Sequence, residues 1–338
     1  MTIGLLRGAA LPVKGLAWLG RQGTRAIAAL VILGLLVPPL GDILRPFVTE
    51  AIFALLCISF MRVDVAQVRA NLRQPGTVLA ATAWTTLAVP ALAGLGCLAV
   101  GLDVRSPDLF LALMLQAVAS PMMASPALAA LMGLDATLVL ITLVTSTALI
   151  PFTAPLFAYL FVGSALTLSP LALGLKLSAI LGGSLLVAAI IRKLVGADAI
   201  RRHKEPIDGI NILILYVFVA AVMGNVVSSF IARPLLMIAL TLFAFAVFLV
   251  LLVATMLLFR KIGAGRALAL GLMVSQRNMG LMLAATDGVL PGATWLYFAL
   301  SQFPIYLAPQ LLKPIARRVL ARPSFDAAGE PVSSPANR

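Results

Sequence analysis

The chain has 338 residues, of which 62% are hydrophobic and only 11% are charged. Soluble domains are about half apolar and about a quarter charged, so this composition excludes an ordinary soluble fold and predicts an integral membrane protein. The formal net charge is +13, and the chain has only two cysteines and one histidine. Cys57 and Cys97 fall in separate apolar stretches and His203 in a basic one, which excludes a disulfide framework, a zinc site and a Ser-His-Asp triad.

The first 25 residues predict an uncleaved basic lead-in on the cytoplasmic side. Arg7, Lys14, Arg21 and Arg25 flank a weak apolar stretch. A cleaved signal peptide has a long apolar core and a small-residue cleavage site, and this stretch has neither. At the other end, residues 314–338 finish in a run rich in Pro, Ser, Ala and Gly, which predicts a disordered cytoplasmic tail.

Residues 26–313, between these ends, predict a membrane domain. Because a helix needs about 20 apolar residues to cross the hydrocarbon core, the region divides into ten spans. Their approximate limits are 26–44, 46–61, 76–100, 109–132, 136–162, 170–191, 208–230, 235–259, 267–290 and 293–312. The first two are short and nearly adjoin, so the sequence defines their limits least sharply.

The basic residues alternate between the two sides of this predicted bundle. Of the 25 Lys and Arg residues, 20 fall in the termini and alternate loops on one side, whereas Arg45, Arg105 and Arg233 fall on the other and Lys176 and Arg277 lie within spans. Cytoplasmic loops carry an excess of Lys and Arg. The pattern predicts a multi-pass protein of the bacterial cytoplasmic (inner) membrane with both termini in the cytoplasm. Membrane topology therefore accounts for the excess of positive charge. The predicted partner is the lipid bilayer, and no nucleic acid is expected.

Ten spans divide into two halves of five, and because five is odd the second half starts on the opposite side of the membrane. The prediction is therefore an all-α membrane protein with ten transmembrane helices as two inverted five-helix repeats, in which the fourth span corresponds to the ninth. Both of these spans are interrupted by polar or proline residues, at 120–126 and 275–278. Backbone groups freed by such breaks are tolerated at membrane depth only where they face protein or a water-filled cavity. Paired broken helices mark a transporter's binding site, so we expect helices 4 and 9 to cross there.

Arg277, in the second break, is the predicted centre of the site. A guanidinium is always charged and presents a planar fork that suits a carboxylate, and an arginine inside a membrane rarely lacks a function. Arg277 could instead pair with a buried acid or with carbonyl groups freed by the break, and the sequence leaves these possibilities open. The predicted substrate-binding residues are Arg277, Asn278, Gln276, Ser275, Ser120, Ser125 and Gln116.

Four motifs resemble those of the bile acid:sodium symporter superfamily. They are RVDVAQVR at 62–69 followed by Gln74-Pro75, Pro121 with Ser125 in the first break, Ser146-Thr147 with Pro151 in the fifth span, and RNMGL at 277–281 in the second break. The resemblance covers about residues 26–313. It implies a core domain of spans 3–5 and 8–10, a panel domain of spans 1–2 and 6–7, and a substrate beside the crossing of the broken helices.

The second break departs from that family where the resemblance implies a sodium site. Sodium-dependent members have a glutamate four residues before the glutamine of this break, at the positions of Met273 and Arg277. Hard cations need several oxygen ligands, and a fixed positive charge repels Na⁺. We therefore expect Arg277 to perform the electrostatic task of the sodium ions. No ion-binding residues are assigned, and Na⁺ and H⁺ stay open as coupling ions.

These features predict a secondary active transporter that moves a small organic anion by alternating access. The alternatives are a cation/proton antiporter of related inverted-repeat fold and a membrane sensor that does not transport. An antiporter needs a carboxylate near the crossing, whereas Asp135 and Asp287 fall at span ends. We expect neither an enzyme nor a cofactor, because the chain has no D-x-x-x-D or D-D-x-x-D motif for a prenyl transferase and no P-loop.

Overall fold

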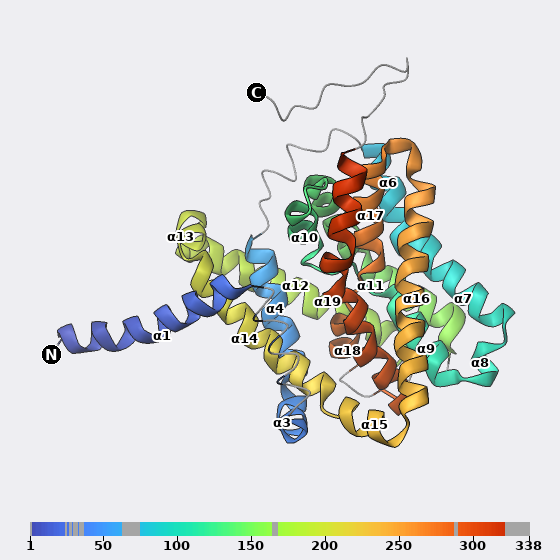
Figure 1. Ribbon diagram of the computed structural model, residues 1–338, viewed down its shortest axis with the longest axis horizontal. Coiled ribbons are helices and arrows are strands. Elements are labelled where there is room, and N and C mark those ends of the chain that lie inside the picture. Colours follow the sequence, from blue (N-terminus) through green and yellow to red (C-terminus); the bar gives the residue numbers. More distant parts are fainter. Residues whose placement is uncertain are drawn as a thin grey trace, which may run out of the picture.

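The computed structural model describes residues 2–23, 26, 29, 33, 37–62, 75–163, 168–286 and 290–321, and for residues 2–11 and 38 it describes the backbone only. Across these ranges the chain is helical between short turns and forms no named strand (Figure 1). Six of the described helices are long and apolar enough to cross a membrane. The protein is therefore an all-α, multi-pass membrane protein.

The helices fall into three parts of the chain. Before the first break they are α1 (Thr2–Gln22), α3 (Pro38–Leu44), η1 (Arg45–Phe47), α4 (Val48–Arg62), α6 (Pro75–Ala83), η2 (Trp84–Ala88), α7 (Val89–Ala99), α8 (Leu102–Arg105) and α9 (Pro107–Val118). Between the breaks they are α10 (Ser125–Leu131), α11 (Ala136–Phe157), η3 (Ala158–Val162), α12 (Pro170–Val195), α13 (Ala197–Arg202), α14 (Lys204–Met223), α15 (Val226–Ala232), α16 (Pro234–Leu258), η5 (Arg260–Ile262) and α17 (Ala264–Ser275). After the second break they are α18 (Met279–Ala285) and α19 (Gly292–Leu320). The turns η1 and η5 are 3₁₀-helical, and η2 and η3 are π-helical.

Five predicted spans are confirmed as long apolar helices to within a few residues. They correspond to Pro75–Ala99, Ala136–Val162, Pro170–Val195, Lys204–Ala232 and Pro234–Leu258. Local capping signals set several of their ends. The Asp135 carboxylate accepts the Leu138 N–H at 3.0 Å and begins α11, and the Ser169 hydroxyl accepts the Ala172 N–H at 3.2 Å and begins α12. The latter helix ends at Gly196, whose φ of +85° favours glycine.

The predicted loop between the first two spans, near Arg45, is wrong. α3, η1 and α4 follow one another without interruption, so Pro39–Arg62 forms one candidate span. Pro46 is accommodated because it lies at the start of a 3₁₀ turn, where a missing N–H costs little. Most of the first predicted span, 26–36, lies outside the described residues.

The helix of the last predicted span continues past residue 313, where a disordered tail was predicted to begin. α19 continues to Leu320 with Pro314 inside it. The proline removes one helical hydrogen bond, but Ala316 is fully buried and Val319 packs against the same apolar cluster. Burial of this face holds the helix together across the proline. The predicted tail beyond residue 321 lies outside the described residues.

The described helices pack as two groups. In one group α1, α3, α4 and α14 lie together; in the other, α6, α7, α9, α10, α11, α16, α17 and α19 pack on one another. α12 packs on both α4 and α11 and so touches both groups. Figure 1 shows α3, α4 and α14 on the left and α16, α17 and α19 on the right. Within the first group, helices approach closely through glycines. A Cβ added to Gly41 would lie 2.6 Å from the Gly224 Cα, so only glycine fits there.

Many large apolar side chains are exposed on the outside of the protein, while several polar ones are buried inside it. Ile231 and Leu235 are 79% and 82% exposed, whereas Ser125 and Gln276 are 0% exposed. So much exposed apolar surface is unusual for a soluble protein, and it is stable if the exposed face lies in hydrocarbon.

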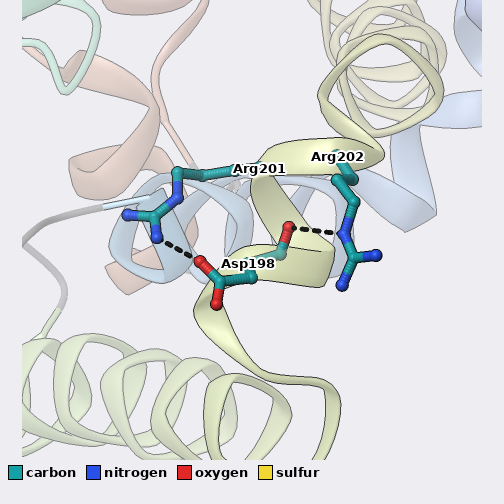
Figure 2. A network of polar contacts seen from close by, with 3 residues as sticks. All are labelled: Asp198, Arg201 and Arg202. Atoms are coloured by element: carbon teal, nitrogen blue, oxygen red, sulfur yellow. Dashed lines mark hydrogen bonds and ion pairs between the residues drawn. The ribbon is translucent and has the colours of Figure 1, made fainter.

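The short helix α13 carries an exposed group of charged side chains. Figure 2 shows Arg201 paired with the Asp198 carboxylate and Arg202 donating to the Asp198 carbonyl oxygen. The side chains of Asp198 and Arg201 are 77% and 70% exposed, so the pair contributes little stability. A turn of this kind suits the aqueous side of a membrane.

Candidate functional site

The two broken helices cross, and each break completes the backbone hydrogen bonding of the other. The Met122 N–H donates to the Gln276 carbonyl at 2.8 Å, and the Asn278 N–H donates to the Ser120 carbonyl at 2.7 Å. Pro121 and Arg277 form an isolated antiparallel bridge between these two contacts. The crossing therefore satisfies backbone groups that would otherwise be unpaired at membrane depth.

Local sequence explains why both helices stop here. α9 ends at Val118, the residue after it adopts an extended conformation, and α10 restarts with Pro126 in its first turn. In the second break Gln276 is extended, and the Asn278 side chain accepts the Leu281 N–H at 3.3 Å to begin α18. Proline and an Asx cap are ordinary helix start signals, here used in the middle of an apolar span.

Arg277 is enclosed at the crossing, with only 1% of its surface exposed. Its NH1 group donates to the Ala119 carbonyl at 3.0 Å, and NH1 and NH2 both donate to the Thr85 carbonyl at 3.3 Å. Nε has no hydrogen-bond partner. Ala119 lies at the carboxyl end of α9, where the helix dipole favours a positive charge.

The Thr85 carbonyl is free because the helix around it is irregular. In a regular α-helix it would accept the Val89 N–H, but η2 is a π turn and that N–H donates to Trp84 instead. The next donor along the chain would be Pro90, which has no N–H. Arg277 therefore satisfies a carbonyl that a π turn and a proline leave open 192 residues away.

Gln276 likewise donates to a backbone carbonyl that a proline leaves without a donor, here in α19. Its Nε2 donates to the Ile305 carbonyl of α19 at 3.2 Å. That carbonyl would normally accept from residue 309, which is Pro309 and has no N–H. The Gln276 Oε1 in turn accepts the Ser125 hydroxyl at 3.3 Å, which ties α10 to the same network.

The predicted site residues divide into two sets. Only Arg277 and Asn278 border the large cavity described below. Ser120, Ser125 and Gln276 hold the crossing together, and the Ser120 hydroxyl is buried without a partner.

The remaining two predicted residues point elsewhere. Gln116 accepts a hydrogen bond from the Tyr297 hydroxyl of α19 at 2.5 Å, and the Ser275 hydroxyl donates to Leu272 in its own helix at 3.0 Å. Neither lines the cavity.

A cavity of about 450 Å³ lies beside the crossing, between α4 and α14 on one side and the breaks and α19 on the other. Its wall is mainly apolar, with Ile52, Met123, Phe218 and Ile305 among the lining residues. Arg277 is the only charged residue among the described residues that line it. The polar lining side chains are Ser59, Asn211, Asn278, Gln302, Tyr306 and Gln310.

Sequence reasoning missed most of these polar lining residues. Gln302, Tyr306 and Gln310 recur every four residues on α19 and so share one helix face. That spacing in an apolar span was the signal that could have found them. Nothing in the sequence around Asn211 distinguishes it from a residue at a helix contact.

Contacts next to Phe218 of the cavity wall join η1 and α14 to α19. The Arg45 guanidinium lies over the Trp295 ring, 4.4 Å from its centroid, and the Trp295 Nε1–H donates to the Val222 carbonyl at 3.2 Å. Just beneath, the Phe218 and Phe298 rings meet edge to face at 6.1 Å. These contacts join α14 and η1 to α19 across the two helix groups.

Part of the cavity wall is exposed. Asn211 and Leu215 are half-buried, and Leu307 and Gln310 are exposed. These residues lie towards the ends of α14 and α19 that carry Lys204 and Arg317. The exposed part of the cavity wall therefore lies towards the basic ends of these two helices.

Comparison of the chain with protein-family models and with curated proteins finds no match. Within the described residues no group of three or more His, Cys, Asp or Glu side chains could hold a metal ion.

Proposed function

We propose that this protein is a secondary active transporter that moves a small amphipathic organic anion across the bacterial inner membrane by alternating access. The observation that carries the proposal is the 450 Å³ cavity beside two crossing broken helices, with Arg277 as the only charge among its described lining residues. Cavities of this size suit a small organic solute. The apolar wall and the few carboxamide groups suit a substrate with an apolar body and a polar end.

The charge of Arg277 favours an anion even though its terminal nitrogens are occupied by carbonyls. Carbonyl oxygens satisfy N–H groups but do not neutralise the guanidinium, and no described carboxylate pairs with it. At about 8 Å and an effective dielectric constant of about 20, a unit negative charge gains roughly 2 kcal/mol from such a cation. The Arg277 Nε–H is itself buried without a partner, so the attraction acts across the cavity wall and the carboxamide groups that line the cavity supply the direct contacts.

The cavity also argues against the cation/proton antiporter. Such a carrier needs a carboxylate that exchanges protons and cations near the crossing, and no described lining residue is acidic. Coupling by Na⁺ at the crossing is disfavoured for a related reason. The Ala119 and Thr85 carbonyls, which could coordinate a cation, already bind the Arg277 guanidinium.

The arrangement of helices supports a rocking mechanism. The Arg45–Trp295 contact and the exposed residues near Gln310 lie towards opposite ends of the interface between α14 and α19, and we propose that relative rotation of the helix groups closes one end and opens the other. We propose ten spans in two inverted repeats, with both termini and the end of the cavity near Gln310 in the cytoplasm, as in the bile acid:sodium symporter superfamily that the sequence motifs resemble.

The test is a ligand-stabilisation screen followed by transport. The purified protein is heated with a panel of organic anions and with matched neutral amides, each in NaCl and in KCl. An anion that binds the folded state raises the melting temperature by mass action, and we expect equal shifts in the two salts. Hits are then assayed for counterflow into proteoliposomes. Stabilisation by the neutral amides alone would refute the anion assignment, and a saturable Na⁺ requirement would refute the coupling argument.

A further inference from the structure

A second cavity, of about 310 Å³, lies where α15 turns into α16, and it shares no lining residue with the first. Its wall combines one cation and two hydroxyls with an apolar surface. The lining residues are Ser228, Ser229, Ala232, Arg233, Leu236, Met237 and Leu296. Because α15 and α16 join the two helix groups, this cavity lies at their connection.

The position of Arg233 in the chain places it at the level of the lipid headgroups. It immediately precedes α16, which has a mean hydropathy of 3.0, the highest of the six candidate spans. The residue at such a boundary lies at the membrane–water interface. On either side of it Ile231 and Leu235 are 79% and 82% exposed, as expected for side chains that face acyl chains.

Arg233 supplies a charge with no acidic partner in the described part of the chain. Its side chain is exposed and lines the cavity together with Ser228 and Ser229. The Ser228 hydroxyl donates to the Asn225 carbonyl at 3.1 Å, which leaves its oxygen as an acceptor. An arginine fork with a neighbouring hydroxyl matches the oxygens of a phosphodiester. The fully buried Met237 and the neighbouring Leu236 and Leu296 continue the cavity as an apolar wall.

We propose that this cavity binds an anionic phospholipid, with the headgroup phosphate on Arg233 and the Ser229 hydroxyl and an acyl chain along Leu236 and Leu296. A zwitterionic choline headgroup would bring a second cation towards Arg233, so an anionic lipid such as phosphatidylglycerol binds more tightly. A lipid held at the α15–α16 turn stiffens the link between the helix groups. This regulatory consequence rests on the proposed transport function, whereas the lipid site does not.

The test measures lipid binding to the full-length protein without any transport substrate. Protein in neutral detergent is titrated with phosphatidylglycerol or phosphatidylcholine, and bound lipid is counted by native mass spectrometry alongside the melting temperature. We expect phosphatidylglycerol to be retained preferentially, and Arg233→Gln to weaken its binding about tenfold or more, as expected for loss of a charge-assisted contact. Arg105→Gln is the matched control, because Arg105 is another exposed arginine at a helix end but lies outside the cavity.

Two further measurements distinguish a lipid site from a damaged protein and from a site for a free phosphate ester. Leu296→Trp fills the apolar part of the cavity without changing any charge, so it should also weaken phosphatidylglycerol binding. This variant tests the site even if the Arg233→Gln protein is unstable. Glycerol phosphate at millimolar concentration should give no stabilisation. Equal stabilisation by glycerol phosphate would show that the site binds a free phosphate ester, and unchanged phosphatidylglycerol binding in the Arg233→Gln or Leu296→Trp protein would overturn the site.

Discussion

Replacing Arg277 by glutamine separates a role in the fold from a role in binding, because the carbonyls it satisfies are known. Arg277→Gln removes the donors that reach Thr85 and Ala119. Each buried carbonyl left without a donor costs about 1–3 kcal/mol, so we expect a loss of roughly 2–6 kcal/mol in the free energy of unfolding. A second substitution can restore one of the two bonds.

Pro90→Ala supplies the N–H that the π turn of η2 lacks for the Thr85 carbonyl. In the parent protein this substitution is expected to change stability little, since Arg277 already fills that carbonyl. In the Arg277→Gln background it should recover about 1–3 kcal/mol. The two substitutions should therefore be coupled by at least about 1 kcal/mol in a double-mutant cycle, although they lie far apart in the sequence.

Thermal and denaturant unfolding of the four proteins in detergent measures the coupling. Pro309→Ala is the matched control, because it frees no new donor for Thr85 and instead serves the Ile305 carbonyl that Gln276 now fills. It should rescue Gln276→Leu and leave Arg277→Gln unaffected. Coupling below about 0.5 kcal/mol between Arg277→Gln and Pro90→Ala, or equal rescue by Pro309→Ala, would refute the assignment of these carbonyl partners.

The same variants test the binding role. If the Arg277 charge attracts the substrate, the stabilised Pro90→Ala, Arg277→Gln protein should still bind the anion at least about tenfold more weakly, equivalent to about 1.4 kcal/mol. The stability defect is then repaired and the affinity defect is not. Normal anion affinity in this well-folded double variant would show that Arg277 serves the fold alone.

Two further predictions concern the moving parts and the topology. Arg45→Ala removes the cation–π contact with Trp295, which is worth about 0.5–1 kcal/mol. Aqueous maleimide should then label a cysteine introduced at Met223 from outside about twofold to fivefold faster. An unchanged labelling rate in vesicles of known orientation would show that this contact does not close the cavity. Cysteines at Ser106 and His203 should be labelled from the periplasm and the cytoplasm, respectively, and labelling of both from the same side would refute the proposed orientation.

Local properties of the sequence determined the class of protein and the positions of the two helix breaks. Hydropathy over about 20 residues depends only on the segment itself and not on the helices packed against it. The limits of long spans such as Ala136–Val162 were therefore predicted to within a few residues. The two breaks were visible for the same reason, because Pro121, Pro126 and Asn278 act on their own backbone. The predicted loop at Arg45 failed because Pro46 lies in the first turn of a 3₁₀ helix, where proline is tolerated. The predicted start of the tail failed because burial of the α19 face outweighs the hydrogen bond lost at Pro314.

Only the tertiary structure decided what the polar residues of the site contact. The guanidinium of Arg277 binds Thr85 because a π turn and Pro90 free that carbonyl in a helix that packs against the crossing, and no local pattern connects the two positions. Gln116 likewise points to Tyr297 and away from the cavity. The partner of a buried polar group depends on which helix lies opposite it. The packing of apolar faces decides which helix that is, and because the hydrophobic effect is not directional, the sequence of one helix does not specify its neighbour.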